Sequence, residues 1–256
     1  FINCMSIKYI ETDSISKICS CLKNIEYSKD PLVIKGGLYL YNLDEWEKFL
    51  TNECGFILDN RHPNYLSHEI ERYSWWEISY QPDKATSFAY SNTPQPLHND
   101  NAWFKNGADF NFNIMKKQAV NGGESTYYSV DKIINDLNKK NPSLLEKLLT
   151  IPVTISKGKN EFSNSTTIIS KKQNNYRIFW NYFRINKDDS IIKKMVNDFF
   201  NFLKIQEENG FVNCSKFEEG DCFVWNDSLL LHGRKSFEAQ KPFDRVINQS
   251  MWYFSE

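Results

Sequence analysis

The chain has 256 residues, of which 41% are hydrophobic and 15% aromatic, and its net charge at pH 7 is −1. This composition predicts a packed globular protein rather than a disordered one. The balanced charge gives no support for a nucleic-acid partner. The sequence has no apolar run of about 18 residues, so we expect no membrane span. The first residues, FINCMSIKYIETDS, also lack the pattern of a signal peptide.

The six cysteines are irregularly spaced and do not form a zinc-finger pattern. We therefore expect reduced thiols that bind no metal, in a cytoplasmic protein. The sequence contains no internal repeat, low-complexity block or linker, which predicts a single domain over residues 1–256.

The N-terminal quarter mixes predicted helices and strands. Residues 14–25 (SISKICSCLKNI) have helical periodicity, and residues 31–42 (PLVIKGGLYLYN) read as strand on both sides of two glycines. Residues 43–55 (LDEWEKFLTNECG) return to helical spacing, and Gly55 is a suitable residue to end that helix.

From about residue 74 the sequence changes to short strand-like runs. The first, ADFNFNIMKK (108–117), alternates apolar and polar residues, which is typical of a strand with one buried face. The others are IPVTIS (151–156), STTIIS (165–170), YRIFWNYFRI (176–185), CFVW (222–225), SLLLH (228–232) and RVINQSMWYF (245–254).

Two predicted helical stretches interrupt these strands. They cover residues 130–149, with Asn141-Pro142 as an internal cap, and residues 188–206. Many short strands with helices inserted among them indicate a β-sandwich or jelly roll rather than a βαβ sheet.

Two of the four histidines lie in segments that could bind a metal ion. His62 and His68 occur in polar turns, where we expect surface residues. His98 is followed at i+2 by Asp100, and such residues share a face of an extended chain. His232 ends an apolar run. Two histidines and one carboxylate form the facial triad of non-haem Fe(II) oxygenases.

The His-x-Asp pair alone is a weak signal, because a His–Asp hydrogen bond at a strand end produces the same pattern. Arg245 lies thirteen residues beyond His232 in an apolar strand. A buried arginine of this kind is suited to bind a carboxylate with two hydrogen bonds.

Five segments in order resemble the taurine dioxygenase/clavaminate synthase-like (TauD/TfdA) family of Fe(II)/2-oxoglutarate-dependent oxygenases. They are LHNDN (97–101), GGEST (122–126), GDCFVWND (220–227), LLLHGR (229–234) and Arg245. The resemblance covers roughly residues 85–254. It implies an α+β, mainly β fold, a double-stranded β-helix or jelly roll. The N-terminal part would be helical, and a helical insert at about 131–205 would lie between core strands.

The resemblance also implies cofactors and site residues. Fe(II) would be held by His98, Asp100 and His232, with 2-oxoglutarate and O2 as co-substrates. Arg245 would bind the distal carboxylate of 2-oxoglutarate. Ser125 would donate its hydroxyl to the same carboxylate, with Thr126 as the alternative.

Three positions depart from the family pattern, and the first is Ser125, which replaces the family's threonine but keeps its hydroxyl. Asn226-Asp227 inverts the usual order, and we expect a structural turn there. Gln249 stands where relatives that act on amino acids often carry a second arginine. It should face the same pocket, so a substrate carboxylate must be held elsewhere. Asp100 is the residue that related halogenases replace with Gly or Ala, so its presence predicts an oxidation without halide.

Asn101 and Trp103 follow the metal pair, and we expect them, with Gln249, to bind substrate. The aromatic clusters SWWEISY (74–80) and FWNYF (179–183) could line the same pocket but are more typical of core packing.

The resulting prediction is an enzyme that converts 2-oxoglutarate to succinate and CO2 and hydroxylates an unactivated C–H bond of a small molecule. By family analogy the substrate is an amino acid or a metabolite derived from one, and a carrier protein would be a partner if that substrate is tethered. Three alternatives remain open. They are a desaturase or cyclising oxidase of the same family, a non-catalytic binding protein on the same fold, and a zinc hydrolase using the same three ligands.

Overall fold

Two β-sheets form the centre of the computed structural model, which describes residues 7–11, 15–63, 70–157, 162–172 and 175–255. Among the described residues, the strands of these two sheets pair antiparallel, except for residues 8–10 and 32–34, which pair in parallel. The larger sheet has the order β1 (Lys8–Ile10), β2 (Leu32–Ile34), β15 (Cys222–Asn226), β8 (Phe110–Lys117), β17 (Val246–Tyr253) and β3 (Ile57–Asp59), with β6 (Trp76–Ser79) also paired to β17. The smaller sheet has the order β14 (Asn213–Ser215), β9 (Ser125–Ser129), β16 (Leu230–Arg234) and β7 (Gln95–His98).

The two sheets share one interior, as the jelly-roll prediction requires. One buried cluster combines Met115, Phe223 and Trp225 of the larger sheet with Tyr127 and Leu230 of the smaller sheet. Residues of β8 on both faces are buried from Phe110 to Met115, so the prediction of one buried face for this strand is wrong. Its outer face is covered by the N-terminal helices, and its asparagines point to the polar interior described below.

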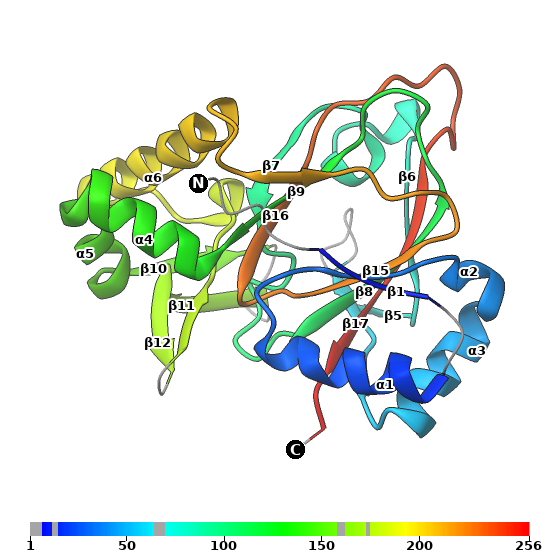
Figure 1. Ribbon diagram of the computed structural model, residues 1–256. Helices are drawn as coiled ribbons and strands as arrows, with labels where there is room; N and C mark the ends of the chain where they lie inside the picture. The colour runs from blue at the N-terminus through cyan, green and yellow to red at the C-terminus, as the bar shows by residue number, and fades with distance from the viewer. Residues whose placement is uncertain (1–6, 12–14, 64–69, 158–161, 173–174, 256) are drawn as a thin grey trace.

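The N-terminal segment covers the outer face of the larger sheet. It contains α1 (Ile15–Lys23), the 3₁₀ turn η1 (Asn24–Tyr27), α2 (Gly37–Leu40), α3 (Leu43–Lys48) and the π-helical turn η2 (Phe49–Glu53). Asn42 and Glu45 form a capping box that starts α3. Trp46 is buried against Phe112 of β8, with ring centroids 4.9 Å apart. In Figure 1 these helices lie on the side of the sheets opposite to α4, α5 and α6.

The strand predicted after the two glycines is wrong. Gly36 has φ +65° and is followed by the short helix α2, which places Trp46 Nε1 2.9 Å from the carbonyl oxygen of Gly37. A Cβ on Gly37 would come within 2.4 Å of Cys222 Sγ. The second glycine therefore permits a close approach to β15 rather than a strand. Gly55, predicted to end the preceding helix, has φ +78°.

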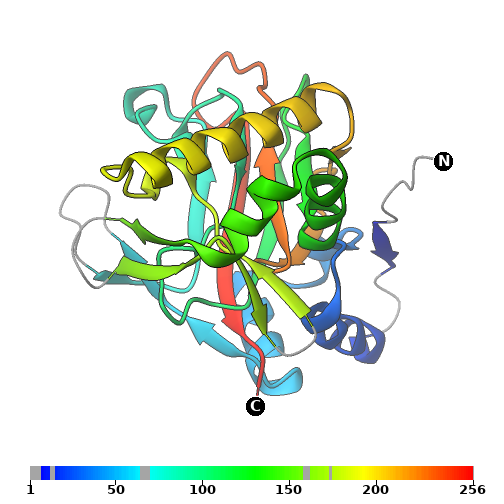
Figure 2. The same cartoon turned by 90° about the vertical axis from the view of Figure 1, so that its left-hand side faces the viewer.

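Between β9 and β14 the chain forms a layer over the smaller sheet (Figure 2). The helices predicted there are present, with Asn141 capping the one that begins at Pro142. Two hairpins accompany them, and the strand predicted over 176–185 ends at Ile178. The elements are α4 (Val130–Lys140), α5 (Pro142–Thr150), β10 (Pro152–Ser156), β11 (Ser163–Thr167), β12 (Ile169–Lys172), β13 (Asn175–Ile178), η6 (Tyr182–Arg184) and α6 (Ser190–Glu208).

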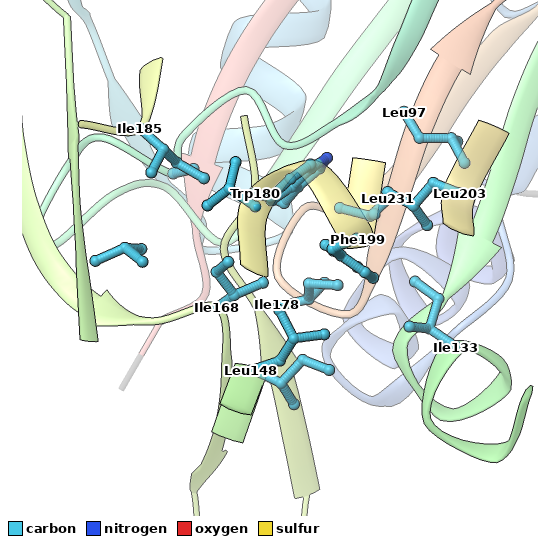
Figure 3. Packing of buried hydrophobic residues seen from close by; sticks show 14 of the residues in the cluster. Leu97, Ile133, Leu148, Ile168, Ile178, Trp180, Ile185, Phe199, Leu203 and Leu231 are labelled. Atoms are coloured by element: carbon cyan, nitrogen blue, oxygen red, sulfur yellow. The ribbon is translucent and has the colours of Figure 1, made fainter. Parts of the chain in front are cut away.

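The largest apolar core lies beneath this layer. Trp180 is fully buried and contacts Phe199 of α6 edge-on, with centroids 4.7 Å apart. Figure 3 shows Trp180 within this cluster together with Leu231 of β16. The core thereby fixes the back of β16, whose other face carries His232. Four remaining short elements line the cavity described below: the paired strands β4 (Arg61–Pro63) and β5 (Ile70–Arg72), and the 3₁₀ turns η3 (Pro82–Lys84) and η4 (Phe88–Tyr90).

Cys19, Cys21, Cys54, Cys214 and Cys222 are free thiols, and Cys4 lies outside the described residues. Within the described part of the chain, none of the helices has the length and apolar character needed to cross a membrane.

Candidate active site

His98 and His232 lie directly opposite each other on neighbouring strands. The antiparallel pair β7 and β16 has His98 and His232 as Cα partners, and their rings are 4.3 Å apart between centroids. Gly233 allows this approach. A Cβ at Gly233 would lie 2.7 Å from the Gln95 carbonyl oxygen and 2.8 Å from Thr126 Oγ1.

Asp100 completes a three-residue cluster with these histidines. Its Oδ1 lies 3.2 Å from His98 Nε2, and its Oδ2 lies 3.5 Å from His232 Nε2. One ligand atom from each residue lies within 4.8 Å of the other two. His98 Nδ1 is 2.9 Å from the Pro96 carbonyl oxygen, so donation to that oxygen leaves Nε2 as the acceptor atom. Nε2 lies 3.0 Å from Gln95 Nε2, an amide that a bound metal would displace from it.

The charges of this cluster suit a divalent metal ion. Burial would raise the pKa of Asp100, but the two histidines hold that pKa well below its usual value. Burial lowers the pKa of His98, whereas the Asp100 carboxylate outweighs burial and raises the pKa of His232. A carboxylate and neutral imidazoles are the forms that bind metals, so a bound cation would oppose protonation of His232. The donor set therefore fits Fe(II).

Asp227 joins the two halves of the cluster. Its carboxylate accepts the backbone N–H groups of Asp100 at 3.2 Å and Asn101 at 2.9 Å, and its Oδ1 lies 3.7 Å from His232 Nδ1. The turn predicted at Asn226-Asp227 is present, since Asn226 Oδ1 accepts the backbone N–H of Ser228 at 3.0 Å. The aspartate adds a function that the turn prediction did not include: it orients the segment carrying Asp100.

Two amides hold the Asp100 carboxylate itself. Asn111 Nδ2 donates to Asp100 Oδ2 at 2.8 Å, and Gln249 Nε2 donates to the same oxygen at 2.9 Å. Gln249 was predicted to bind substrate. It does line the active-site cavity, but its amide is hydrogen-bonded to Asp100, a candidate metal ligand.

A cavity of about 990 Å³ contains this cluster and extends to Arg245. Arg245 is 3% exposed, and its Nε has no hydrogen-bond partner among the described residues. Ser125 also lines the cavity, whereas Thr126 is on the opposite face of β9 beside Gly233. Gly123 has φ +76°, and a Cβ there would lie 3.2 Å from Arg245 Nε. Gly123 thus makes room for the guanidinium, whereas Gly122 allows a close approach to the Ser236 carbonyl oxygen, 2.2 Å from a Cβ at that position.

A second buried arginine stabilises the loop beside Arg245. Arg234 Nη2 donates to the carbonyl oxygens of Phe88, Ser91 and Thr93.

Burial, with the nearby Arg234 charge, lowers the pKa of Arg245. The guanidinium stays charged at neutral pH, so this end of the cavity favours an anion.

Asn101 and Trp103 both line the cavity as well. Asn101 Oδ1 and Trp103 Nε1 are buried without hydrogen-bond partners in the described structure. The aromatic residues of the segments 74–80 and 179–183 are divided between the cavity and the apolar core. Trp76, Tyr182 and Phe183 line the cavity, while Trp180 belongs to the core.

The prediction of a surface position for His62 is wrong. His62 is 4% exposed, lines the cavity and stacks on Tyr73 with centroids 3.9 Å apart. Burial lowers its pKa to about 4. Its polar sequence neighbours suggested a turn, but the β4–β5 hairpin packs the ring inward. His68 lies outside the described residues.

Sequence reasoning missed several residues that hold this site together. Asn99 lies between two of the predicted ligands. Its Oδ1 accepts the backbone N–H of Trp180 at 2.8 Å, and its Nδ2 donates to the Leu230 carbonyl oxygen at 3.1 Å. Asn111 and Asn113 alternate with phenylalanines on β8, so the same period that indicated a strand also placed two amides on its inner face. Lys157 was missed because its nearest sequence neighbours carry no motif.

The chain matches the family model of taurine catabolism dioxygenases, the TauD/TfdA family, over residues 59–251. Its structure is similar to asparagine oxygenase, with a TM-score of 0.68 and 12% identity over 93% of this chain and 79% of that chain. It is also similar to the non-haem iron oxygenase OrfP, solved with iron and α-ketoglutaric acid (TM-score 0.65, 11% identity, 94% and 80% covered).

A third similar structure is the PvcB protein from Pseudomonas aeruginosa (TM-score 0.65, 13% identity, 95% and 84% covered). No curated protein sequence matches the chain. At these identities the solved structures establish a common fold, and the family match confirms the relationship predicted from the five sequence segments. The chain therefore belongs to the TauD/TfdA family of Fe(II)/2-oxoglutarate-dependent dioxygenases.

Proposed function

We propose that this protein hydroxylates an unactivated C–H bond of an amino acid or of a metabolite derived from one, with conversion of 2-oxoglutarate to succinate and CO2. One observation carries the proposal. The three ligand atoms of His98, Asp100 and His232 lie within 4.8 Å of one another, in the same cavity as the buried guanidinium of Arg245. This pairing suits a metal that binds a dicarboxylate co-substrate.

Each residue has a specific role in this proposal. His98, Asp100 and His232 hold Fe(II), which together with 2-oxoglutarate and O2 supplies the oxidising power when bound. Arg245 and Ser125 bind the distal carboxylate of 2-oxoglutarate. Asp227, Asn111 and Gln249 keep the metal ligands in one orientation, and the buried walls exclude water from the reacting groups.

Similar structures support an amino acid as the substrate class. The asparagine oxygenase structure contains 2S,3S-3-hydroxyasparagine and succinate. The OrfP structure contains (3S)-hydroxy-L-Arg. We infer that the substrate of this chain is a free or carrier-bound amino acid. We also infer a single-domain enzyme of the cytoplasm, where its free thiols would stay reduced.

Arg245 and the amides around Asp100 argue against two of the alternatives, the zinc hydrolase and the binding protein without catalysis. A zinc hydrolase with the same three ligands gives no reason to bury a guanidinium at the end of the cavity. A binding protein without catalysis gives no reason to hold Asp100 with two amides.

The decisive experiment combines the purified protein, Fe(II) and 2-oxoglutarate without oxygen and records the metal-to-ligand charge-transfer band. We expect the band in the wild type. In Arg245→Gln the dissociation constant for 2-oxoglutarate should rise about 100-fold, because a buried charge-assisted contact is lost. Arg72→Gln removes an exposed guanidinium and serves as the control. A folded wild-type protein without the band would overturn the proposal.

A further inference from the structure

Lys157 is a buried cation on the wall of the active-site cavity. It directly follows β10, is 7% exposed and lines the cavity that contains the metal ligands. Its Nζ lies 4.5 Å from the centre of the Trp103 ring, which fixes where the ammonium group points. Burial and the nearby Arg184 charge lower the pKa of Lys157 to about 7, against the opposing effect of the Asp100 carboxylate. A lysine in such surroundings is stabilised when an anion binds beside it.

Arg184 lies close to Lys157 because two segments of the insert meet. Ile155 and Ile185 form an isolated antiparallel bridge, and Asn186 N donates to the Thr154 carbonyl at 2.9 Å. This bridge is two residues before Lys157 and one residue after Arg184. Arg184 is partly exposed and lines the same cavity. The two cations therefore share one wall.

Once iron and 2-oxoglutarate are bound, the charged groups around the metal site balance one another. In the proposed enzyme, the two positive charges of iron and the one of Arg245 balance Asp100 and the two carboxylates of 2-oxoglutarate. Arg234 is already bound to three carbonyl oxygens. The other acids of the described cavity lining, Glu71 and Asp83, are exposed. A substrate entering between iron and Lys157 would meet two basic side chains, which suit an anionic group.

We propose that Lys157 and Arg184 form the subsite that binds the carboxylate of an amino-acid substrate. This inference rests on the proposed function. It answers the question raised by Gln249, whose amide is bound to Asp100 and which replaces the arginine that relatives use. Trp103 forms the floor under the ammonium group. His62 also faces this cavity, and its buried Nε2 has no hydrogen-bond partner among the described residues, so it can bond a second polar group of the substrate.

The test uses the anaerobic complex of the enzyme with Fe(II) and 2-oxoglutarate. The probe is a mixture of the twenty L-amino acids, compared with the same mixture of their C-terminal carboxamides. Perturbation of the charge-transfer band reports binding next to the metal, and the most tightly bound member is then titrated alone. We expect the amino acids to perturb the band and the carboxamides to do so far more weakly.

Variants locate the subsite. Lys157→Met should raise the dissociation constant of that amino acid about tenfold to hundredfold, because one charge-assisted contact is lost. Arg184→Gln should weaken binding in the same direction, while Lys157→Arg should restore most of it. Lys84→Met, at an exposed lysine of the cavity mouth, is the matched control and should leave binding unchanged.

The possible failures are distinct. Absence of the charge-transfer band in the wild type overturns the proposed function and this inference with it. A normal band that the amino acids do not perturb, or that carboxamides perturb equally, overturns the inference alone. The same holds if Lys157→Met, with a normal band, binds the amino acid as tightly as Lys84→Met.

Discussion

Gln249 donates a hydrogen bond to Asp100 over 2.9 Å, although 149 positions separate the two residues in the chain. Asn111 donates to the same carboxylate oxygen. The carboxylate is therefore held in one orientation before any metal binds, and its other oxygen faces His98. Gln249, at the position where relatives often carry a substrate-binding arginine, is therefore bonded to a candidate metal ligand instead.

Replacing Gln249 with Leu should weaken metal binding. Loss of a hydrogen bond that orients a ligand typically costs about tenfold to hundredfold in metal affinity. The measurement is an anaerobic titration with Fe(II), together with thermal unfolding of the metal-free protein, which should change little. Gln240→Leu alters an exposed glutamine and is the control. Equal metal affinities of the two variants would show that Gln249 does not position Asp100.

Ser125 and Thr126 can be separated by paired substitutions. Ser125 lines the cavity, whereas Thr126 packs beside Gly233 on the other face of β9. Ser125→Ala should raise the KM for 2-oxoglutarate about tenfold, the effect of one lost hydrogen bond to a charged group. Thr126→Ala should leave this KM nearly unchanged. The opposite order would assign the hydroxyl contact to Thr126.

Replacing Asp100 with Gly should abolish hydroxylation. The substitution removes one of three metal ligands and leaves the amides of Asn111 and Gln249 without their acceptor. Succinate formation and hydroxylated product, measured on the best amino acid of the panel, should both fall to background. Asp83→Gly, at an exposed acid of the cavity mouth, is the control. Full activity in Asp100→Gly would remove this residue from the metal site.

His62 should make the fold sensitive to acid. Its pKa is about 4 in the folded protein because burial outweighs the attraction of Asp59 and Glu71, and Lys157 lowers it further. In the unfolded chain its pKa is about 6.5. The unfolded state therefore binds more protons between these values. The stabilisation by neutral His62 is complete above about pH 6.5 and is lost as pH falls to about 4.

The lost stability amounts to about 3 kcal/mol for a shift of this size. Urea unfolding at pH 6.5 and pH 4 checks the prediction. The wild type should lose about that much more free energy of unfolding over this interval than His62→Gln, in which the titrating group is absent. Identical pH dependence of the two proteins would mean that the pKa of His62 is the same in the folded and unfolded states.

Local sequence was sufficient to predict many elements of the fold. The 3.6-residue period predicted α4, α5 and α6, and the alternating or apolar runs predicted β8, β15, β16 and β17. These predictions succeed because side-chain periodicity and helix capping act over a few residues. The strand expected after the two glycines, over residues 38–42, failed for a tertiary reason, since Gly37 is packed against Cys222 and begins α2 instead.

The order of a few motif residues in the sequence was also sufficient to predict the family. The order of His98, Asp100, His232 and Arg245, with the glycine pair before Ser125, predicted the family that the family match confirmed. Motif residues can be recognised this way because metal and carboxylate binding allow few side-chain types.

What only the tertiary structure decided is which of these residues touch. The register of β7 and β16 places His98 against His232, and the pairing of β8 and β17 brings Asn111 and Gln249 to Asp100. Burial of His62 and the meeting of Lys157 with Arg184 depend on how the hairpins pack over the cavity. Such contacts are set by strand register and core packing between segments far apart in the chain, which no local pattern of residues encodes.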